Sequence, residues 1–350
     1  MITIKDVAQH AGVSVSTVSY VLSGKRPISR ATSQRVRRSI SKLGFHPNAG
    51  ARALASSRTN VLALVVPLRT DLNLPVIMQF VSSIVTTARA HDYDVLLLTK
   101  ESSADEVHRV IGSSMADAVI VMDVEARDPR IPALRELDVP VVLVGVPTDP
   151  DGLGCVDLDF TASGARTVAH LADLGHRSLA LIGSPPAVYE RETGYATRFL
   201  SGFTDCARQR GVTVHVHPCA PSYSALSACL DDLLRPELAV TGLVVHNEAV
   251  LADVVLELRR RDRRVPEDIS VIALCPDAIA AAQPVPLTSI AIPAEEVGSI
   301  AVEMLMRGLA GEQPSEVRLL APQLIDRGST VTAPRTADRS TQTTPVSRSR

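Results

Sequence analysis

The 350-residue sequence contains no tryptophan, few other aromatic residues and no long apolar run. Phe and Tyr make up only 3% of it. No uninterrupted apolar stretch approaches the roughly 18 residues that a membrane-spanning helix needs. The first residues, MITIKDVAQHAGVS, lack the apolar core and the small-residue cleavage site of a secretory signal peptide. These absences argue against membrane insertion and export, and they predict a cytoplasmic protein.

Cysteine clusters and catalytic motifs are also missing. Five cysteines stand singly without a C-x-x-C pair, which is typical of a reducing compartment. His215 and His217 alternate in VTVHVH, but no cysteine or carboxylate cluster completes a set of metal ligands. A G-x-S-x-G elbow, a Walker loop and an H-E-x-x-H motif are absent as well. We therefore predict no metal, no cofactor and no catalytic residue.

The net charge of −2 conceals a strong asymmetry. Residues 1–58 hold three Lys and seven Arg against Asp6 as their one acidic residue, a net charge of +9. Subtraction from the totals of 36 basic and 38 acidic residues leaves 26 and 37 for residues 59–350, a net charge of −11. A basic head on an acidic body indicates a polyanionic partner for the head, although a solvated basic face would have the same composition.

The basic head is expected to form three short helices. Apolar residues recur at helical spacing in residues 4–11, 15–23 and 29–43. Ser14 can cap the second helix, because its hydroxyl can accept a hydrogen bond from a backbone N–H of the first turn. A glycine follows each helix and supplies its stop, at Gly12, Gly24 and Gly44.

The body alternates short apolar runs with helical stretches. The expected strands are VLALVVP, DVLLLT, DAVIVM, VPVVLVGV, LALIG, VTVHVH, GLVVHN, ISVIAL and LTSIAI. The expected helices cover residues 76–91, 163–174, 198–210, 248–261 and 294–309. This alternation predicts an α/β fold of two doubly wound parallel-sheet lobes, similar to periplasmic binding proteins. A ligand cleft is expected between the lobes, beyond the carboxyl ends of the strands.

Two strings in the head carry a family resemblance. IKDVAQHAGVSVSTVSYVLSGKRPIS and LGFHPNAGARAL resemble the head of the LacI/GalR family of bacterial transcriptional regulators over residues 4–58. RTNVLALVVP, HDYDVLLL, HLADLGHRSLALIG, GLVVHNEAV and RRVPEDISVIAL extend the resemblance over almost the whole chain. It implies a sequence-specific regulator, most simply a repressor, which binds a pseudo-palindromic DNA operator as a homodimer. It also implies allosteric control by a small-molecule effector, such as a sugar or a related metabolite.

The resemblance and the composition together divide the chain into four parts. Residues 1–46 are expected to be the helix-turn-helix domain, and residues 47–58 a hinge helix or linker. Residues 59–328 would form the two-lobed effector-binding and dimerisation domain. The remainder, residues 329–350, is rich in Ser, Thr, Arg and Pro, and we expect disorder from about Ser329.

The second head helix would read the major groove. A helix that approaches bases closely needs small or polar residues at its start. The resemblance places Val15, Ser16 and Tyr20 at base edges, although Tyr20 replaces the Arg that the family commonly has there. Phosphate anchors, which set register without reading sequence, are expected at Ser14, Thr17, Ser19, Arg26 and Arg35. A hydroxyl at any one of these positions can equally be an ordinary cap or surface group.

The segment PNAGARALA, residues 47–55, is similar to the family's hinge helix. It is shorter than the roughly 12 to 15 residues that an isolated helix needs in water, and Gly50 weakens it by about 1 kcal/mol relative to Ala. We expect it to fold only on DNA, against the same helix of a second subunit. The resemblance gives Asn48, Ala51 and Leu54 DNA contacts in the minor groove. Leu54 matches the family's wedge between central base pairs, although it can also pack on the body.

Six body residues are expected to bind the effector, by their match to family motifs. They are Asn73, Asp159, Phe160, Arg198, Asn247 and Cys275. Three positions depart from the family: Cys275 stands where an Asp is usual, Phe160 replaces an Asn, and Arg198 lies one place from the usual Arg. These changes remove a carboxylate and an Arg that could bind a polar ligand. They suggest a ligand that is less polar than a free sugar, a ligand that is held by other residues, or no ligand. Capping of the next helix is an equal interpretation for Asp159 and Asn247.

Other classes of protein fit less of the sequence. A solute-binding protein of a transporter would share the lobes but not the basic head. A nonspecific nucleoid protein would fit the charge but leave the body without a role. A regulator whose body serves only dimerisation stays open, as does the choice between an inducer and a corepressor.

Leu54→Ala is expected to weaken operator binding strongly and to leave the body folded. An apolar wedge opens the minor groove by unstacking one flexible pyrimidine-purine step, for which we predict C-G at the operator centre. Footprinting would measure the affinity. An unchanged operator affinity would remove the wedge role.

Overall fold

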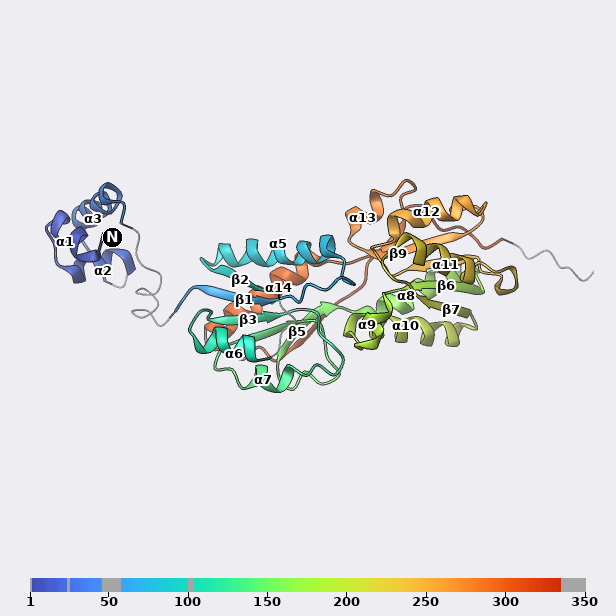
Figure 1. Ribbon diagram of the computed structural model, residues 1–350, viewed down its shortest axis with the longest axis horizontal. Coiled ribbons are helices and arrows are strands. Elements are labelled where there is room, and N and C mark those ends of the chain that lie inside the picture. Colours follow the sequence, from blue (N-terminus) through green and yellow to red (C-terminus); the bar gives the residue numbers. More distant parts are fainter. Residues whose placement is uncertain (1, 24–25, 46–57, 100–103, 335–350) are drawn as a thin grey trace, which may run out of the picture. The chain divides into compact units, whose positions relative to one another are not determined.

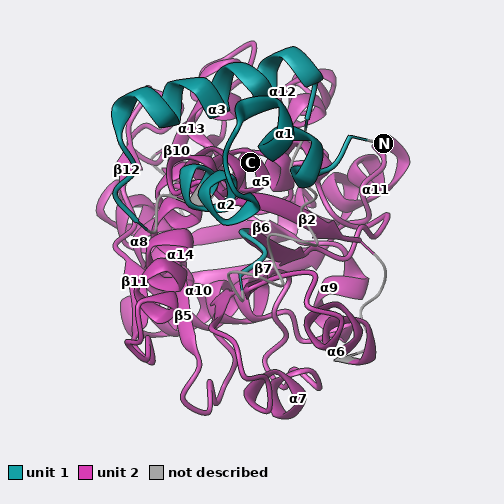
Figure 2. Cartoon of the chain, turned by 90° about the vertical axis from the view of Figure 1, so that its left-hand side faces the viewer, with its two compact units in different colours: residues 1–60 teal, residues 61–350 magenta. Residues whose placement is uncertain are grey.

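The computed structural model describes residues 2–23, 26–45, 58–99 and 104–334 (Figure 1). The chain divides into two compact units, residues 1–60 and 61–350 (Figure 2). Gly24, nearly all of the predicted hinge with Asn48, Ala51 and Leu54, and residues 335–350 of the predicted tail lie outside the described ranges.

The first unit contains the three predicted helices: α1 (Ile4–Ala11), α2 (Val15–Ser23) and α3 (Arg30–Leu43). Thr3 and Asp6 form a capping box at the start of α1, and Gly12 ends that helix with a positive φ of 61°. Gly44 ends α3 with the same φ, which a residue with a Cβ adopts only with strain. Apolar side chains from all three helices meet in one small core: Val7, Ala8, Ala11, Val18, Val36 and Phe45.

The first lobe of the second unit is built on a six-stranded parallel sheet in the order β11-β5-β4-β3-β1-β2 (Figure 1). Its strands are β1 (Val61–Val65), β2 (Asp94–Leu98), β3 (Ala118–Val121), β4 (Val141–Val144), β5 (Gly154–Leu158) and β11 (Val317–Leu320). Helices α5 (Leu74–Ala90) and α14 (Ala294–Leu309) share a core on one face. Helices α6 (Ala104–Gly112) and α7 (Ile131–Arg135) cover the other.

The second lobe repeats this design, with the strand order β12-β10-β9-β8-β6-β7. Its strands are β6 (Ser178–Gly183), β7 (Thr213–Pro218), β8 (Gly242–Val245), β9 (Ser270–Cys275), β10 (Thr288–Ala291) and β12 (Leu324–Ile325), and only β12 is antiparallel to its neighbour. Helices α8 (Phe160–Asp173) and α10 (Gly194–Arg210) cover one face. Helices α11 (Tyr223–Leu233), α12 (Leu251–Arg260) and α13 (Asp277–Ala281) cover the other, and α9 (Pro186–Glu190) follows β6.

The chain passes between the lobes three times, because β5, β10 and β11 are each followed by an element of the other lobe. The predicted α/β class with two parallel-sheet lobes is confirmed. The apolar pattern did not predict β5, β11 or β12. Gly154 and Asp157 interrupt β5, β11 is a half-exposed edge strand, and β12 has only two residues.

The expectation of disorder from Ser329 is wrong for residues 329–334. Ser329 is fully buried, donates a hydrogen bond to the Val271 carbonyl at 2.6 Å and accepts one from Thr288 N at 2.7 Å. The backbone N–H groups of Val331 and Ala333 bond to Ser270 Oγ and to the Leu174 carbonyl. The prediction relied on polar composition. Ser and Thr side chains are polar, but they can also form hydrogen bonds with backbone groups at the starts of strands, as Ser329 does here.

Helices α8 and α10 pack so closely that their backbones touch. A Cβ on Gly202 would lie 1.9 Å from the Thr161 carbonyl oxygen, and one on Gly164 would lie 2.2 Å from the Phe199 carbonyl oxygen. Only a residue without a side chain permits this approach. The contact fixes the position of α10, which carries Tyr195 and Arg198 toward the first lobe.

Gly202→Ala is therefore expected to lower the free energy of unfolding by about 3 kcal/mol or more, because backbone has to move to admit the methyl group. Gly112→Ala is the matched control, since its added Cβ meets nothing within 4 Å and its φ is ordinary; its effect should stay within about 1 kcal/mol. Urea denaturation measures both. Equal midpoints for the two variants would contradict the close contact.

Candidate functional site

The start of α2 presents a compact set of hydroxyl groups. Ser14 Oγ caps the helix by accepting a hydrogen bond from Thr17 N at 3.1 Å, and it lies 2.8 Å from both Ser16 Oγ and Thr17 Oγ1. Val15 is 41% exposed beside them. The predicted capping role of Ser14 is therefore observed, and the small exposed residues leave the first turn of α2 open to close approach by a partner.

Tyr20 and Arg26 lie together at the other end of α2. The Arg26 guanidinium carbon lies 5.2 Å from the centre of the Tyr20 ring, a cation–π geometry. Ser19 is exposed on α2 and Arg35 on α3. All eight predicted contacts within the described part of the head thus lie at least partly exposed on the helix-turn-helix unit.

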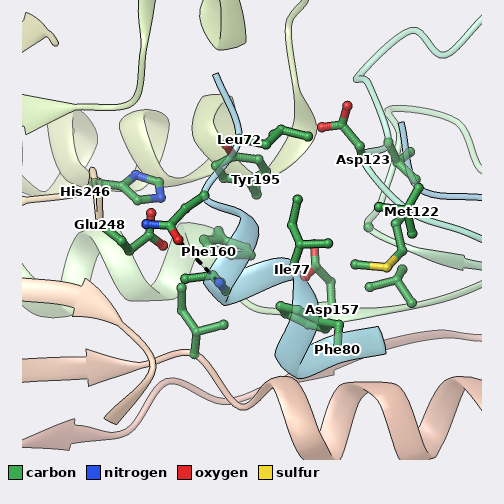
Figure 3. A pocket seen from close by; sticks show the side chains of 17 residues that line it. Leu72, Ile77, Phe80, Met122, Asp123, Asp157, Phe160, Tyr195, His246 and Glu248 are labelled. Carbon is green, nitrogen blue, oxygen red and sulfur yellow. Dashed lines mark hydrogen bonds between the residues drawn. The ribbon is translucent and has the colours of Figure 1, made fainter. Parts of the chain in front are cut away.

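The second candidate site is a cavity between the two lobes (Figure 3). From the first lobe it is lined by the carboxyl ends of β1, β3, β4 and β5 and by the first turns of α5. From the second lobe come Phe160 at the start of α8, Tyr195 at the start of α10, and His246 and Glu248 after β8. This is the place where parallel sheets bind ligands, since the helices and loops that follow the strands open there.

The cavity is small and mainly apolar. Its volume is about 130 Å³, and a cavity of about 150 Å³ accommodates benzene. Its apolar side chains are Val66, Leu72, Val76, Ile77, Phe80, Met122, Val124, Val144 and Ile292. A ligand of about one ring therefore matches its size.

Three rings form the wall on the side of the second lobe. The Phe160 and Tyr195 ring centres are 5.7 Å apart, and the His246 ring lies 5.7 Å from Tyr195 and 6.1 Å from Phe160. His246 is buried, its Nδ1 has no hydrogen-bond partner among the residues that the structure describes, and burial lowers its pKa to about 3. The imidazole is therefore neutral at physiological pH and can offer a hydrogen bond but no charge.

Asp157, at the end of β5, forms an ion pair with Arg198 of α10 and so joins the lobes at the cavity. The Arg198 guanidinium also lies 5.6 Å from the Phe160 ring centre and donates from Nε to the Gly194 carbonyl at 3.2 Å. Burial raises the pKa of Asp157 to about 6, although Arg198 opposes that shift. The arginine one place from the family position thus reaches the cavity wall.

Asp123 follows β3 with a positive φ of 54° and pairs with Arg69 through Oδ2. Its side chain is 6% exposed, and its Oδ1 has no hydrogen-bond partner among the described residues. Burial raises the pKa of Asp123, and Arg69 opposes the rise most strongly. One carboxylate oxygen therefore stays available to a ligand.

Glu248 is the third acid of the cavity, and no Lys or Arg of the described ranges pairs with its side chain. Burial raises its pKa to about 7. It also helps to raise the pKa of Tyr195, which shows that the two side chains are close enough to interact. Glu248 is thus a partly buried carboxyl group without a compensating charge.

Contacts at the rim hold the lobes together. Arg191 of the second lobe pairs with Asp71 of the first at 2.7 Å, and Gly194 N donates to the Val124 carbonyl at 2.9 Å. Ala126 N donates to the Glu192 carbonyl at 2.8 Å. The cavity is therefore bounded by polar contacts that any separation of the lobes would have to break.

The six predicted effector residues fall into two groups. Asn73 and Phe160 line the cavity, and Arg198 reaches it through Asp157. Asp159 caps α8 by accepting from Ala162 N at 2.9 Å, and Asn247 donates to the Cys219 carbonyl at 2.7 Å and caps Ala249 N at 3.2 Å. Cys275 is fully buried in the core of the second lobe, and burial raises its thiol pKa to about 12.

The sequence did not point to Asp123, Asp157, Tyr195 or His246 as cavity residues. Each lies at or just after the end of a strand or at the first turn of a helix, which is the one signal that could have found them. The resemblance matches Asn247 and Glu248 to an Asn-Asp pair of the family, but only Asn247 was predicted to bind the effector. The aromatic wall could not be predicted because its rings come from three separate elements.

Among the described residues, none of the helices combines the length and the apolar composition that crossing a bilayer requires. Within the same ranges, no group of three or more His, Cys, Asp or Glu side chains is placed to hold a metal ion.

A basic helix-turn-helix unit followed by a two-lobed sheet body defines a class, that of DNA-binding transcription regulators with a sensor-like body. Two family profiles agree with this class. One, described as "Bacterial regulatory proteins, lacI family", matches residues 3–48, and the other, "Periplasmic binding protein-like domain", matches residues 168–330.

Known proteins extend the similarity over nearly the whole chain. The HTH-type transcriptional regulator CelR of Thermobifida fusca is 29% identical over 329 residues, which cover 91% of this chain and 95% of CelR. The structure of a CelR–cellobiose complex is 27% identical, with a TM-score of 0.67 over 94% of this chain and 100% of that one. The lac repressor dimer bound to operator and an anti-inducer has a TM-score of 0.82 at 22% identity, over 94% and 99%.

The chain belongs to the LacI/GalR family of bacterial transcriptional regulators, as the resemblance predicted. It is a DNA-binding transcription regulator. Its relatives are named as regulators and not as enzymes.

Glu248→Gln is expected to stabilise the protein at high pH only. A carboxyl group whose pKa rises from 4.5 to about 7 on folding binds more protons in the folded state between these values, so the free energy of unfolding falls as pH rises through that window. The stability difference between the variant and wild type should therefore grow by about 3 kcal/mol from pH 4.5 to pH 8. Urea denaturation at both pH values measures it.

Glu237→Gln is the control, since Glu237 is exposed and outside the cavity. Its stability difference from wild type should not change with pH. A pH-independent difference for Glu248→Gln as well would contradict the burial of that carboxyl group.

Proposed function

We propose that this protein is a repressor that binds a pseudo-palindromic DNA operator as a homodimer and is controlled by a small-molecule effector, such as a sugar or a related metabolite. One observation carries the proposal: a single chain joins an exposed, hydroxyl-lined α2 on a basic unit to an interlobe cavity in which one buried carboxylate oxygen, Asp123 Oδ1, has no hydrogen-bond partner among the described residues. The first feature suits DNA, and the second suits a ligand.

On the DNA side, Val15, Ser16 and Tyr20 read base edges from the major groove. Val15 can contact a thymine methyl group, and the Ser16 hydroxyl can donate or accept a hydrogen bond. Phosphate contacts come from Ser14, Thr17, Ser19, Arg26 and Arg35. Asn48, Ala51 and Leu54 act in the minor groove when the hinge folds on the operator.

On the effector side, Asn73 and Phe160 contact the ligand directly, and Arg198 acts through Asp157. The effector shifts the lobes between two arrangements, and the Arg191–Asp71 and Arg198–Asp157 pairs are contacts that differ between them. A ligand that favours the DNA-binding arrangement is a corepressor, and one that favours the other is an inducer. The unpaired Asp123 Oδ1 favours a ligand-binding body over one that serves only dimerisation.

Pairing of two bodies presents two recognition helices to the two halves of the operator. Exposed Leu74 and Met78 on α5, 49% and 46% accessible, supply apolar surface for such pairing. A regulator that binds chromosomal DNA in a bacterium acts in the cytoplasm. In this role the protein binds and releases DNA and catalyses no reaction.

The test compares two duplexes at fixed salt. Genome-wide mapping of bound sites first supplies the operator, and titration then gives the affinities for the operator and for a random duplex of equal length. Specific regulators bind operators about 10³-fold or more tightly than random DNA. A ratio near one, or a monomer in analytical ultracentrifugation, would overturn the proposal.

Two variants in the helix-turn-helix unit distinguish residues that contact base edges from residues that contact phosphates. Tyr20→Ala should reduce discrimination at one half-site position by about 1–3 kcal/mol, whereas Arg35→Ala should weaken all duplexes alike and lower the salt slope by about 1 per arginine. Arg208→Ala, an exposed arginine of α10, is the control and should change neither quantity. A uniform loss for Tyr20→Ala would contradict base reading.

A further inference from the structure

The polar groups left open in the cavity are acceptors rather than cations. The lining contains the acids Asp123, Asp157 and Glu248, and no Lys or Arg is among its described residues. Arg198 and Arg69 are engaged from outside, with Asp157 and Asp123 respectively. A ligand that presents a carboxylate or a phosphate would therefore meet repulsion with no cation to receive it.

Glu248 is the one acid of the three without an arginine partner among the described residues. A partly buried carboxylate without a compensating charge costs free energy, and the group responds by holding its proton more tightly. Its raised pKa, about 7, is the expected response. A ligand cation at this place would remove that cost, whereas a neutral ligand would supply hydrogen bonds only.

The surroundings of Glu248 suit a cation in a second, independent way. The rings of Tyr195 and His246 lie beside it in the wall, 5.7 Å apart and edge to face, with Phe160 stacked against His246 (Figure 3). Aromatic faces attract a desolvated ammonium group. His246 itself is neutral, because burial lowers its pKa to about 3, so it does not oppose a cation.

Asp123 lies on the opposite side of the cavity from Glu248 (Figure 3). Within the described part of the chain its Oδ1 has no hydrogen-bond partner, and its side chain is 6% exposed. Buried polar atoms are usually hydrogen-bonded, so a donor at the far end of the ligand would satisfy this oxygen. Between the two acids the walls are apolar, and the volume of about 130 Å³ limits the ligand body to about one ring.

We propose that the effector is a compact cationic amine, whose ammonium group pairs with Glu248 against the Tyr195 and His246 rings and whose other end donates a hydrogen bond to Asp123. This inference rests on the proposed function only in taking the cavity as the effector site. A ring-sized amine, including an amino sugar, fits this description. A neutral polyol could form hydrogen bonds in the cavity but no ion pair with Glu248, and an anion would be repelled by the acids of the lining.

The test uses full-length protein and pairs of compounds that differ in one group: benzylamine and benzyl alcohol, cyclohexylamine and cyclohexanol, glucosamine and glucose. Thermal shift and calorimetry measure binding at pH 7.5. At least one amine should bind about tenfold or more tightly than its alcohol, which corresponds to about 1.4 kcal/mol. Alcohols that bind as well as their amines, or no binding by any amine up to about 10 mM, which is a free energy weaker than about −3 kcal/mol, would overturn the proposal.

Charge at Glu248 is then tested directly. Glu248→Gln should weaken binding of the amine about tenfold or more and leave the paired alcohol within about twofold. Glu248→Asp keeps the charge and should retain the preference for the amine, which guards against a folding defect in the first variant. Glu237→Gln should bind like wild type. Equal affinity of the amine for wild type and Glu248→Gln would overturn the assignment.

Failure of this inference is distinguishable from failure of the proposed function. Operator specificity of wild type, measured without any small molecule, tests the proposed function alone. A neutral saccharide that shifts operator affinity equally in wild type and Glu248→Gln would support the proposed regulator function and overturn the proposal of an amine effector.

Discussion

The Asp157–Arg198 ion pair is the interaction on which the sensing body depends. It joins β5 of the first lobe to α10 of the second at the wall of the cavity. A buried carboxylate needs such a partner, and removal of one member of a buried pair is strongly destabilising. Arg198 lies on α10, and Gly164 and Gly202 permit the close packing of that helix on α8. A backbone contact within the second lobe thus helps to position a side chain that pairs with the first lobe.

The acids of the cavity have different environments although they share one small space. Asp157 and Asp123 each face an arginine, whereas Glu248 faces none of the described cations. Burial raises the pKa of all three, and only for the first two does an arginine oppose the rise. An ion pair that bridges the lobes holds them together, while an uncompensated acid makes the cavity responsive to what enters it. The cavity wall thus contains both an ion pair that joins the lobes, Asp157–Arg198, and an acid without an arginine partner among the described residues, Glu248.

The structure shows where the three residues that depart from the family pattern lie relative to the cavity. The shifted Arg198 still reaches the wall, and Phe160 provides the surface on which it stacks. Cys275, in place of the usual carboxylate, lies in the core of the second lobe and does not line the cavity. Glu248 supplies a carboxyl group to the lining. The three rings of the wall, Phe160, Tyr195 and His246, come from different elements. Proteins that are 22% to 29% identical to this chain over nearly its whole length share its fold.

Local patterns in the sequence determined the three helices of the head, the cap at Ser14, the parallel two-lobed architecture and the family, because helix spacing, caps and buried strands are written in neighbouring residues. They could not determine which residues meet in the cavity. Asp123, Asp157, Tyr195 and Glu248 are far apart in the chain, and they converge only because the carboxyl ends of strands in two lobes face each other. Residues 329–334 show the same limit, since Ser329 and Val331 form hydrogen bonds with the first residues of β9 and β10, which are distant in the chain. The composition of a segment indicates whether it can fold by itself. Only the tertiary structure shows whether other parts of the chain bury the segment and form hydrogen bonds with it.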